Sequence, residues 1–328
     1  MKVCIVGAGA IGGWIGTRLA AAGIEVSAIA RGATRASLQE HGWRLQTAEG
    51  PIQAPVAGVS EHAEDLGIQD LVVIAVKGPA LTTVAAGLKP LLGEQTTVLP
   101  AMNGVPWWFC RGLAEFGEPL QSVDAGGVIN TAIPFEQVMG CVVHASTATT
   151  EPGLVKHKGG NGLIVGEASG GDSDRSTRVV ELLKRGGFDV THSENIRQDI
   201  WYKLWGNLTM NPVSALTGAT IDRILADELV RNFCSEAMEE AKLIGERIGC
   251  AIGESPEARH AITAKLGAFK TSMLQDVEAH RQLELDAIVG VVFEMGNRLG
   301  IPLPNIGALL GLSRLMARER GLYPDAPI

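Results

Sequence analysis

Residues 3–12 read VCIVGAGAIG, an apolar run that ends in a glycine-rich turn. The run has the length and β-branched composition of a buried strand, and residues 14–22 (WIGTRLAAA) continue as a helix-like segment. The turn fits the pattern G-x-G-x-x-G in the setting that the pattern needs, after a strand and before a helix. Gly7 allows a sharp bend, Gly9 lets the backbone approach a pyrophosphate, and Gly12 lets the helix pack closely on the strand. The sequence therefore predicts a βαβ unit that binds a dinucleotide.

A bound pyrophosphate would lie at the N-terminus of this helix, where free N–H groups and the helix dipole favour negative charge. A glycine turn with a purely structural role is the alternative. The residues expected to contact the cofactor are Gly7, Ala8, Gly9, Ala10, Ile11 and Gly12.

The end of the second predicted strand (residues 26–30) bears on the choice of coenzyme. An NAD site usually places Asp or Glu there, about 20 residues after the glycine turn, to bind the ribose 2′-hydroxyl. This chain has Arg31, whose planar guanidinium suits a 2′-phosphate instead. The sequence therefore predicts NADP(H), the alternative being that Arg31 is a solvated surface residue.

Two further predicted strands also end in polar residues. Residues 71–76 are followed by Lys77, and residues 97–100 lead to Asn103. Taken singly, Lys77 is explained by a surface position and Asn103 by a turn. Ligands of open parallel sheets bind outside the carboxyl ends of the strands, however, and all four cofactor-compatible sites follow strand ends. Together they favour a dinucleotide site.

Alternating strands and helices predict a parallel sheet, so we expect an α/β fold with an N-terminal Rossmann-type doubly wound sheet followed by an all-helical C-terminal domain. Further apolar runs are expected to extend the sheet, partly antiparallel, at residues 122–129, 141–145, 163–167 and 189–192. Helical spacing then replaces strand signals, at residues 195–210, 221–249, 255–269, 283–299 and 305–321. We therefore predict an NADP-binding Rossmann-like domain over 1–193 and a helical substrate and catalytic domain over 194–328.

Charge and cysteine content limit the partners. A formal net charge of −8 over 328 residues, without a Lys/Arg-rich run, argues against nucleic-acid binding. The 5 cysteines are scattered and never spaced Cys-x-x-Cys, which indicates neither a disulfide framework nor a zinc site, and no metal is expected. No apolar run reaches the roughly 18–20 residues that span a bilayer. We expect a soluble, cytoplasmic protein.

A second polar pattern lies in the helical half, where residues 199–212 read DIWYKLWGNLTMNP. Lys203, Asn207 and Asn211 recur every four residues, which places them on one face of a helix. Asn211 is expected near the helix end, because the residue before proline disfavours helical geometry. Polar side chains in so apolar a segment need partners or a polar cavity, although a surface lysine with a buried stem is the alternative.

A third polar set follows downstream. Residues 271–276 read TSMLQD, and Glu284 lies one helical turn before Ile288, at the margin of a predicted buried face. The edge of an ordinary amphipathic helix would explain this set equally well.

These motifs together resemble the ketopantoate reductase family (2-dehydropantoate 2-reductases) over nearly the whole chain. The matching features are the glycine turn with Arg31, Lys77, Asn103-Gly104, Trp201-x-Lys203-Leu204-x-x-Asn207-x-x-x-Asn211-Pro212, and Ser272-Met273-Leu274-Gln275-Asp276 with Glu284-Leu285-Asp286. The last two motifs are the specific ones. The resemblance implies NADPH-dependent reduction of ketopantoate.

The resemblance also implies a role for each residue. Lys203 matches the catalytic lysine, which donates a proton to the carbonyl oxygen, and Glu284 matches the glutamate that pairs with that lysine and a substrate hydroxyl. Asn103 would contact both nicotinamide ribose and substrate. Substrate-binding positions are matched by Asn207, Asn211 and Ser272, and Asp276 belongs to the same motif without a clear role. A cation fits this chemistry, because ketone reduction builds negative charge on oxygen.

Other functions stay open at this stage. The segment 106–109 matches no substrate-defining pattern, so a paralogue acting on another 2-oxo or hydroxy acid is one alternative. A non-catalytic NADP(H)-binding sensor is another, although it would need neither Lys203 nor Glu284. The apolar helices at 283–299 and 306–316 would cover a homodimer interface or fill the domain core.

Overall fold

The computed structural model describes residues 1–325, and the chain folds into two compact units. The sheet unit comprises Met1–Trp108 and Gly127–Asp199, and the helical unit comprises Phe109–Gly126 and Ile200–Ile328. Residues 326–328, the end of the predicted second domain, lie outside the described part. The segment 109–126 thus joins the helical unit although it lies far upstream of the helices in sequence.

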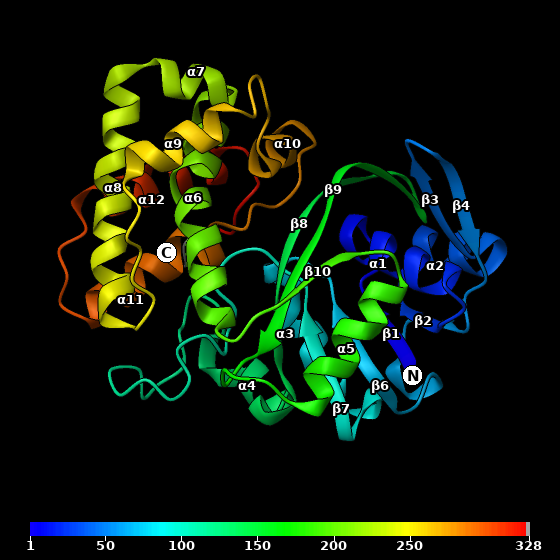
Figure 1. Ribbon diagram of the computed structural model, residues 1–328. Coiled ribbons are helices and arrows are strands. Elements are labelled where there is room, and N and C mark those ends of the chain that lie inside the picture. Colours follow the sequence, from blue (N-terminus) through cyan, green and yellow to red (C-terminus); the bar gives the residue numbers. More distant parts are fainter. Residues whose placement is uncertain (326–328) are drawn as a thin grey trace. The chain divides into compact units, whose positions relative to one another are not determined.

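A five-stranded parallel sheet forms the first layer of the sheet unit (Figure 1). Its strands are β1 (Lys2–Val6), β2 (Glu25–Ile29), β5 (Val59–Ser60), β6 (Gln69–Ile74) and β7 (Leu92–Pro100), in the order β5-β2-β1-β6-β7. All four neighbouring pairs are parallel. Numbered in chain order within this sheet, the strands run 3-2-1-4-5, the order of a Rossmann-type doubly wound sheet, so the prediction of such a sheet is confirmed.

A second sheet corrects one prediction. The runs after residue 140 do not extend the first sheet but form another, with order β10-β9-β3-β4 and β8 paired to β9. Its strands are β3 (Trp43–Thr47), β4 (Gly50–Ala54), β8 (Met139–Glu151), β9 (Leu154–Glu167) and β10 (Asp189–His192). Apolar alternation identifies strands but not their partners, and here β9 pairs in parallel with β3, from a distant part of the chain.

The expected strand at 122–129 is wrong. The chain forms turns there, then a short 3₁₀ segment (Ala125–Gly127) and the helix α4 (Val128–Ala132). Gly126 and Gly127 have φ of 70° and 71°, a left-handed conformation that a strand cannot contain.

Helix α1 (Ala10–Ala21) packs between the two sheets of the sheet unit. A Cβ at Gly16 would lie 2.6 Å from the Trp43 ring of β3, so the absence of a side chain sets this close approach. The Trp43 indole in turn donates to the Val26 carbonyl of β2 at 3.2 Å. The remaining helices are α2 (Gly32–His41), α3 (Gly78–Ala85) and α5 (Asp174–Arg185).

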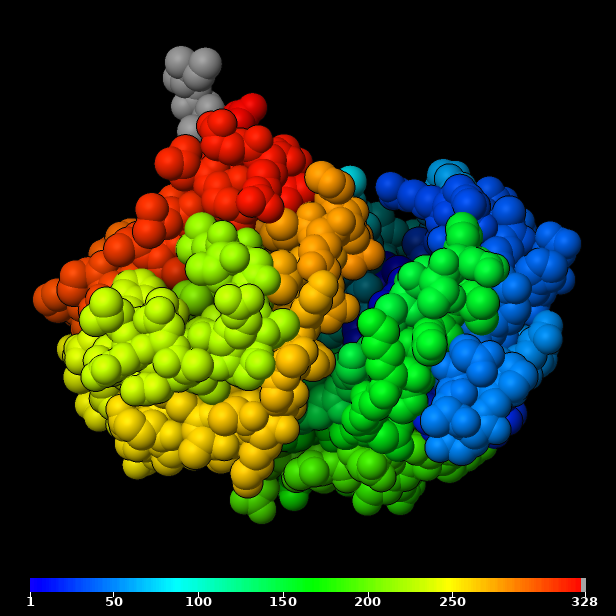
Figure 2. Space-filling model, turned by 90° about the horizontal axis from the view of Figure 1, so that it is seen from above, coloured from blue at the N-terminus to red at the C-terminus, as the bar shows by residue number. Residues whose placement is uncertain are grey.

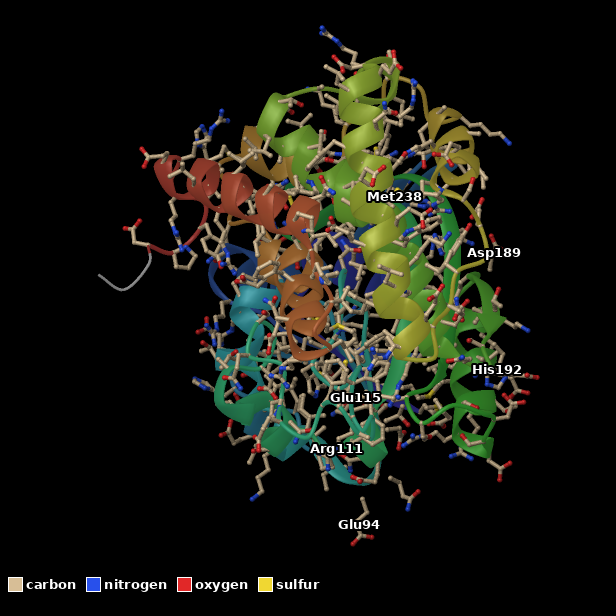
Figure 3. All side chains as sticks on the ribbon, turned by 90° about the vertical axis from the view of Figure 1, so that its left-hand side faces the viewer. Glu94, Arg111, Glu115, Asp189, His192 and Met238 are labelled. Carbon is tan, nitrogen blue, oxygen red and sulfur yellow. The ribbon has the colours of Figure 1, made fainter. Side chains whose placement is uncertain are left out.

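Helices alone build most of the helical unit, and Figure 2 shows one face of it, with α7 to α10 in lime to orange and α12 in red. They are α6 (Ile196–Thr217, whose first turn belongs to the sheet unit), α7 (Ile221–Ala226), α8 (Glu228–Arg247), α9 (Pro256–Ala264), α10 (Ser272–Glu278), α11 (Val291–Arg298, preceded by a π-helical turn, Asp286–Gly290) and α12 (Pro304–Glu319). The helix predicted over 221–249 is two helices, because the Asp227 carboxylate caps α8 by accepting from the Leu229 and Val230 amides. The backbone carbonyl of Met238 accepts the Trp205 indole N–H of α6 at 2.9 Å. Figure 3 labels Met238 on α8.

A carboxylate ties the segment 109–126, which carries Arg111 and Glu115 of Figure 3, to α11. Glu294 accepts the Gln121 and Ser122 amides, each at 2.8 Å, and pairs with Arg298. Burial opposes the charged form, but the Ser122 and Gln121 amides and Arg298 outweigh it, so the pKa of Glu294 lies below its usual range. This clamp fixes a segment that is irregular up to the short 3₁₀ segment at its end.

Candidate active site

The glycine turn contains two positions where the packing of the chain requires glycine and one position, Gly9, where it does not. Gly7 has φ of 95°, and a Cβ there would lie 2.7 Å from Val76. A Cβ at Gly12 would lie 2.0 Å from the Gly7 carbonyl oxygen. At Gly9, the N-cap of α1, a Cβ would meet nothing within 4 Å. The space over Gly9 is therefore open at a helix N-terminus, as a bound phosphate needs.

The other residues of the glycine turn are not glycines and differ in burial. Ala8 is buried, and Ala10 and Ile11 open the first turn of α1 with half-buried side chains.

Arg31 lies where the prediction places it. It follows β2, occupies the N-cap of α2, and is exposed. Within residues 1–325 its guanidinium makes no hydrogen bond or ion pair, whereas Arg35, one turn later, pairs with Glu61 at 3.5 Å. The Arg31 side chain is therefore available to a ligand.

The register of the parallel strands places the four predicted cofactor segments along one edge of the first sheet. Val6 lies opposite both Ile29 and Ile74, and Ile74 lies opposite Pro100. The four strands therefore end in one row, and the glycine turn, Arg31 and the half-buried Lys77 and Asn103 all follow that row. Sequence alone could predict the strand ends but not their common row.

Lys203, Asn207 and Asn211 lie on one face of α6, but α6 does not end where predicted. The helix continues through Pro212 to Thr217. Proline removes one N–H donor, and the residues after it are buried (Val213 at 5% and Ser214 at 0% exposure), so tertiary packing outweighs the local penalty. Lys203 and Asn207 are half-buried, and Asn211 is buried at 6%.

A network that the sequence did not reveal holds the neighbouring face of α6. Tyr202 donates to Glu254 at 2.6 Å, and Arg259 donates to the Tyr202 hydroxyl at 3.1 Å while lying 4.6 Å over its ring. Burial and Glu254 raise the pKa of Tyr202. A Cβ at Gly206 would lie 2.7 Å from the Arg259 guanidinium, so a larger residue there would require this side chain to shift. The network anchors the turn that carries Lys203.

The downstream polar set is divided between a helix and an irregular segment. Ser272 is the exposed first residue of α10, and Thr271 caps that helix by accepting the Leu274 amide at 3.2 Å. Asp276 is 9% exposed and pairs with Arg281 at 2.8 Å. Glu284 is half-buried and precedes the π-helical turn, so the helix predicted from 283 begins two residues later.

Metal-binding clusters and membrane-spanning helices are both absent from residues 1–325. No group of three or more His, Cys, Asp or Glu side chains there could hold a metal ion. None of the helices in that part of the chain is both long and apolar enough to cross a membrane.

Comparison with known proteins decides the family. The family model "Ketopantoate reductase PanE/ApbA" matches residues 3–170, and its C-terminal counterpart matches 195–317. The chain belongs to the ketopantoate reductase family. A 2-dehydropantoate 2-reductase of Mesorhizobium japonicum is 42% identical over 98% of this chain and 100% of its own length.

Solved structures agree with this assignment. A candidate ketopantoate reductase from Ralstonia solanacearum shares 53% identity with a TM-score of 0.94, over 98% of this chain and 99% of its own. D-mandelate dehydrogenase, solved with NADH and anilino(oxo)acetate, has a TM-score of 0.83 at 21% identity over 98% of this chain and 100% of its own, a likeness of fold alone. This member of the ketopantoate reductase family is an oxidoreductase that acts on a small molecule, and its family implies a nicotinamide cofactor.

Proposed function

We propose that this protein reduces 2-dehydropantoate (ketopantoate) to pantoate with NADPH. The observation that carries the proposal is the polar face of α6, where Lys203, Asn207 and Asn211 share one side of the helix among the buried apolar residues Trp201, Leu204, Trp205, Leu208 and Met210. Polar side chains are costly in such surroundings, which supports a ligand-binding role. The name of the Mesorhizobium japonicum relative supports the substrate.

The residues present fit a nicotinamide dinucleotide. The segment Gly7, Ala8, Gly9, Ala10, Ile11 and Gly12 would hold the pyrophosphate over the open space at Gly9. Arg31 would bind a 2′-phosphate, which is the reason to prefer NADP(H) over NAD(H). Lys77 and Asn103 would hold the remainder from the adjoining strand ends.

When bound, the cofactor supplies the hydride that reduces the carbonyl carbon. As the carbon–oxygen π electrons move onto oxygen, the Lys203 ammonium stabilises the developing charge and donates the proton that completes the hydroxyl group. Glu284 would accept a hydrogen bond from the substrate hydroxyl and favour the charged form of Lys203. Asn103, Asn207, Asn211 and Ser272 would orient the substrate.

Three wider assignments accompany this function. Residues 1–193 would form the NADP-binding domain and 194–328 the substrate and catalytic domain. A homodimer and a cytoplasmic location stay predictions, to be checked by sedimentation and by cell fractionation.

The test is NADPH oxidation, followed by absorbance, with ketopantoate beside a panel of other 2-oxo acids and an NADH control. Efficient turnover of ketopantoate with NADPH is expected. A clear preference for another 2-oxo acid would overturn the substrate but keep the Lys203 chemistry. Tight NADPH binding without turnover of any 2-oxo acid would contradict the enzymatic proposal and favour the sensor.

A further inference from the structure

Glu284 lies in an irregular segment whose backbone is anchored on both sides. No helix or strand contains it, because α10 ends at Glu278 and the π-helical turn begins at Asp286. Its neighbours Leu283 and Leu285 are 1% and 0% exposed. A carboxylate on such a segment points in a definite direction only if other groups hold the backbone.

Two adjacent residues beyond α12 supply these contacts. The Leu322 carbonyl accepts the Leu283 amide at 2.9 Å, on one side of Glu284. The Tyr323 hydroxyl donates to Asp286 Oδ1 at 2.6 Å, on the other side.

The Asp286 carboxylate makes further contacts besides the hydrogen bond from Tyr323. Arg314 of α12 lies 3.6 Å from the same carboxylate oxygen that Tyr323 binds. A Cβ at Gly290 would lie 3.2 Å from that oxygen, so a glycine at the end of the π-helical turn leaves room for the carboxylate. Single turns of π-helix are frequent at functional sites, and this one begins two residues after Glu284.

Tyr323 is itself held in place. The Leu322 amide donates to the Ala317 carbonyl at 2.7 Å, and the Leu322 side chain is 2% exposed. Arg318 lies 5.5 Å over the Tyr323 ring. Burial and the Asp286 carboxylate raise the pKa of Tyr323 to about 12, so its hydroxyl stays protonated and donates throughout the neutral range.

We propose that Leu322 and Tyr323 position Glu284 for the reaction, with Tyr323 acting through Asp286. The inference rests on the proposed role of Glu284. Active-site groups work only when their direction is fixed closely, and irregular backbone needs such supporting contacts more than a helix does. Tyr323 is therefore a positioning residue that need not touch the substrate.

The test is a double-mutant cycle on the full chain with ketopantoate and NADPH. Tyr323→Phe keeps the ring and removes the hydrogen bond, and it should lower kcat/KM for ketopantoate about tenfold while KM for NADPH is unchanged. In the Glu284→Gln background the same substitution should have almost no further effect, because the carboxylate that it positions is already lost. Asp286→Asn keeps an acceptor oxygen and should retain most activity, whereas Asp286→Ala should behave like Tyr323→Phe.

Tyr202→Phe is the matched control, because Tyr202 also donates to a carboxylate at 2.6 Å, that of Glu254. The fold-change in kcat/KM caused by Tyr202→Phe should be the same in the wild-type background and in the Glu284→Gln background. Two results would overturn the positioning role alone: a Tyr323→Phe enzyme with wild-type kinetics, or a tenfold loss that multiplies with that of Glu284→Gln. Wild-type turnover by Glu284→Gln would instead remove the role proposed for Glu284, and the inference with it.

Discussion

Gly9 and Gly12 belong to the same turn, yet alanine at the two positions should affect two different properties, cofactor binding and folding. A Cβ at residue 12 would lie 2.0 Å from the Gly7 carbonyl oxygen and 2.9 Å from Ile5. A Cβ at residue 9 would contact no atom within 4 Å. Gly12→Ala should therefore affect folding, and Gly9→Ala should affect cofactor binding.

The cost of Gly12→Ala follows from the backbone atom that it meets. An ordinary contact needs more than about 3.4 Å, so the turn or the helix must shift by about 1.4 Å. A backbone carbonyl cannot rotate away as a side chain can, so we expect the upper part of the range for overpacking, about 3 kcal/mol. In a unit of this size that corresponds to a fall in Tm of about 6–12 °C.

Gly9→Ala should leave stability within about 0.5 kcal/mol of wild type. Alanine restricts the unfolded chain, which stabilises by about 0.4–1 kcal/mol, but it is a poorer N-cap than glycine by a similar amount. The methyl group would occupy the space proposed for the pyrophosphate. We expect the Kd for NADPH to rise about 10- to 100-fold, which is about 1.4–2.8 kcal/mol.

Thermal unfolding with and without NADPH measures both effects in one experiment. NADPH at about 100 times its wild-type Kd should stabilise the wild type by about 2.7 kcal/mol, and at the same NADPH concentration Gly9→Ala should lose about 1.3–2.3 kcal/mol of that gain. A Gly9→Ala variant with the wild-type response to NADPH would refute the placement of the pyrophosphate over residue 9. If that variant lost as much stability as Gly12→Ala without ligand, the space at residue 9 would not be open.

Three other substitutions test the proposed chemistry and the fold. Lys203→Ala should lose most turnover while NADPH binding persists, and near-normal turnover with tight NADPH binding would remove the general-acid role. Arg31→Ala should raise KM for NADPH about tenfold and weaken the discrimination against NADH; steady-state kinetics with both coenzymes would expose an unchanged preference. Glu294→Gln should cost about 1–2 kcal/mol at neutral pH in urea unfolding, because it weakens the hydrogen bonds that hold segment 109–126. Since the pKa of Glu294 is lowered on folding, its contribution is present above the unfolded value of about 4.3 and is lost as pH falls through the folded value. The gap to wild type should therefore close in acid, and a gap that persists there would contradict the clamp.

Local patterns were sufficient for the parts of the molecule that short segments determine. The run 3–6 and the turn after it predict a strand, a bend and a helix, because period, β-branching and glycine positions act within a few residues. The spacing of Lys203, Asn207 and Asn211 predicts a shared helix face for the same reason. The cofactor and substrate roles came from these patterns together with the family resemblance.

Tertiary structure decided the features that depend on distant residues. Strands β3 and β4 join a sheet with β8 to β10, because partners are selected by packing across the whole chain and not by their own sequences. Helix α6 continues past Pro212 because burial of the following turn outweighs the lost hydrogen bond. Tyr323 reaches Asp286 across 37 positions of sequence, a contact that no local period encodes. Sequence thus determined local conformation and which faces are polar, and only the free energy of long-range packing determined which of them meet.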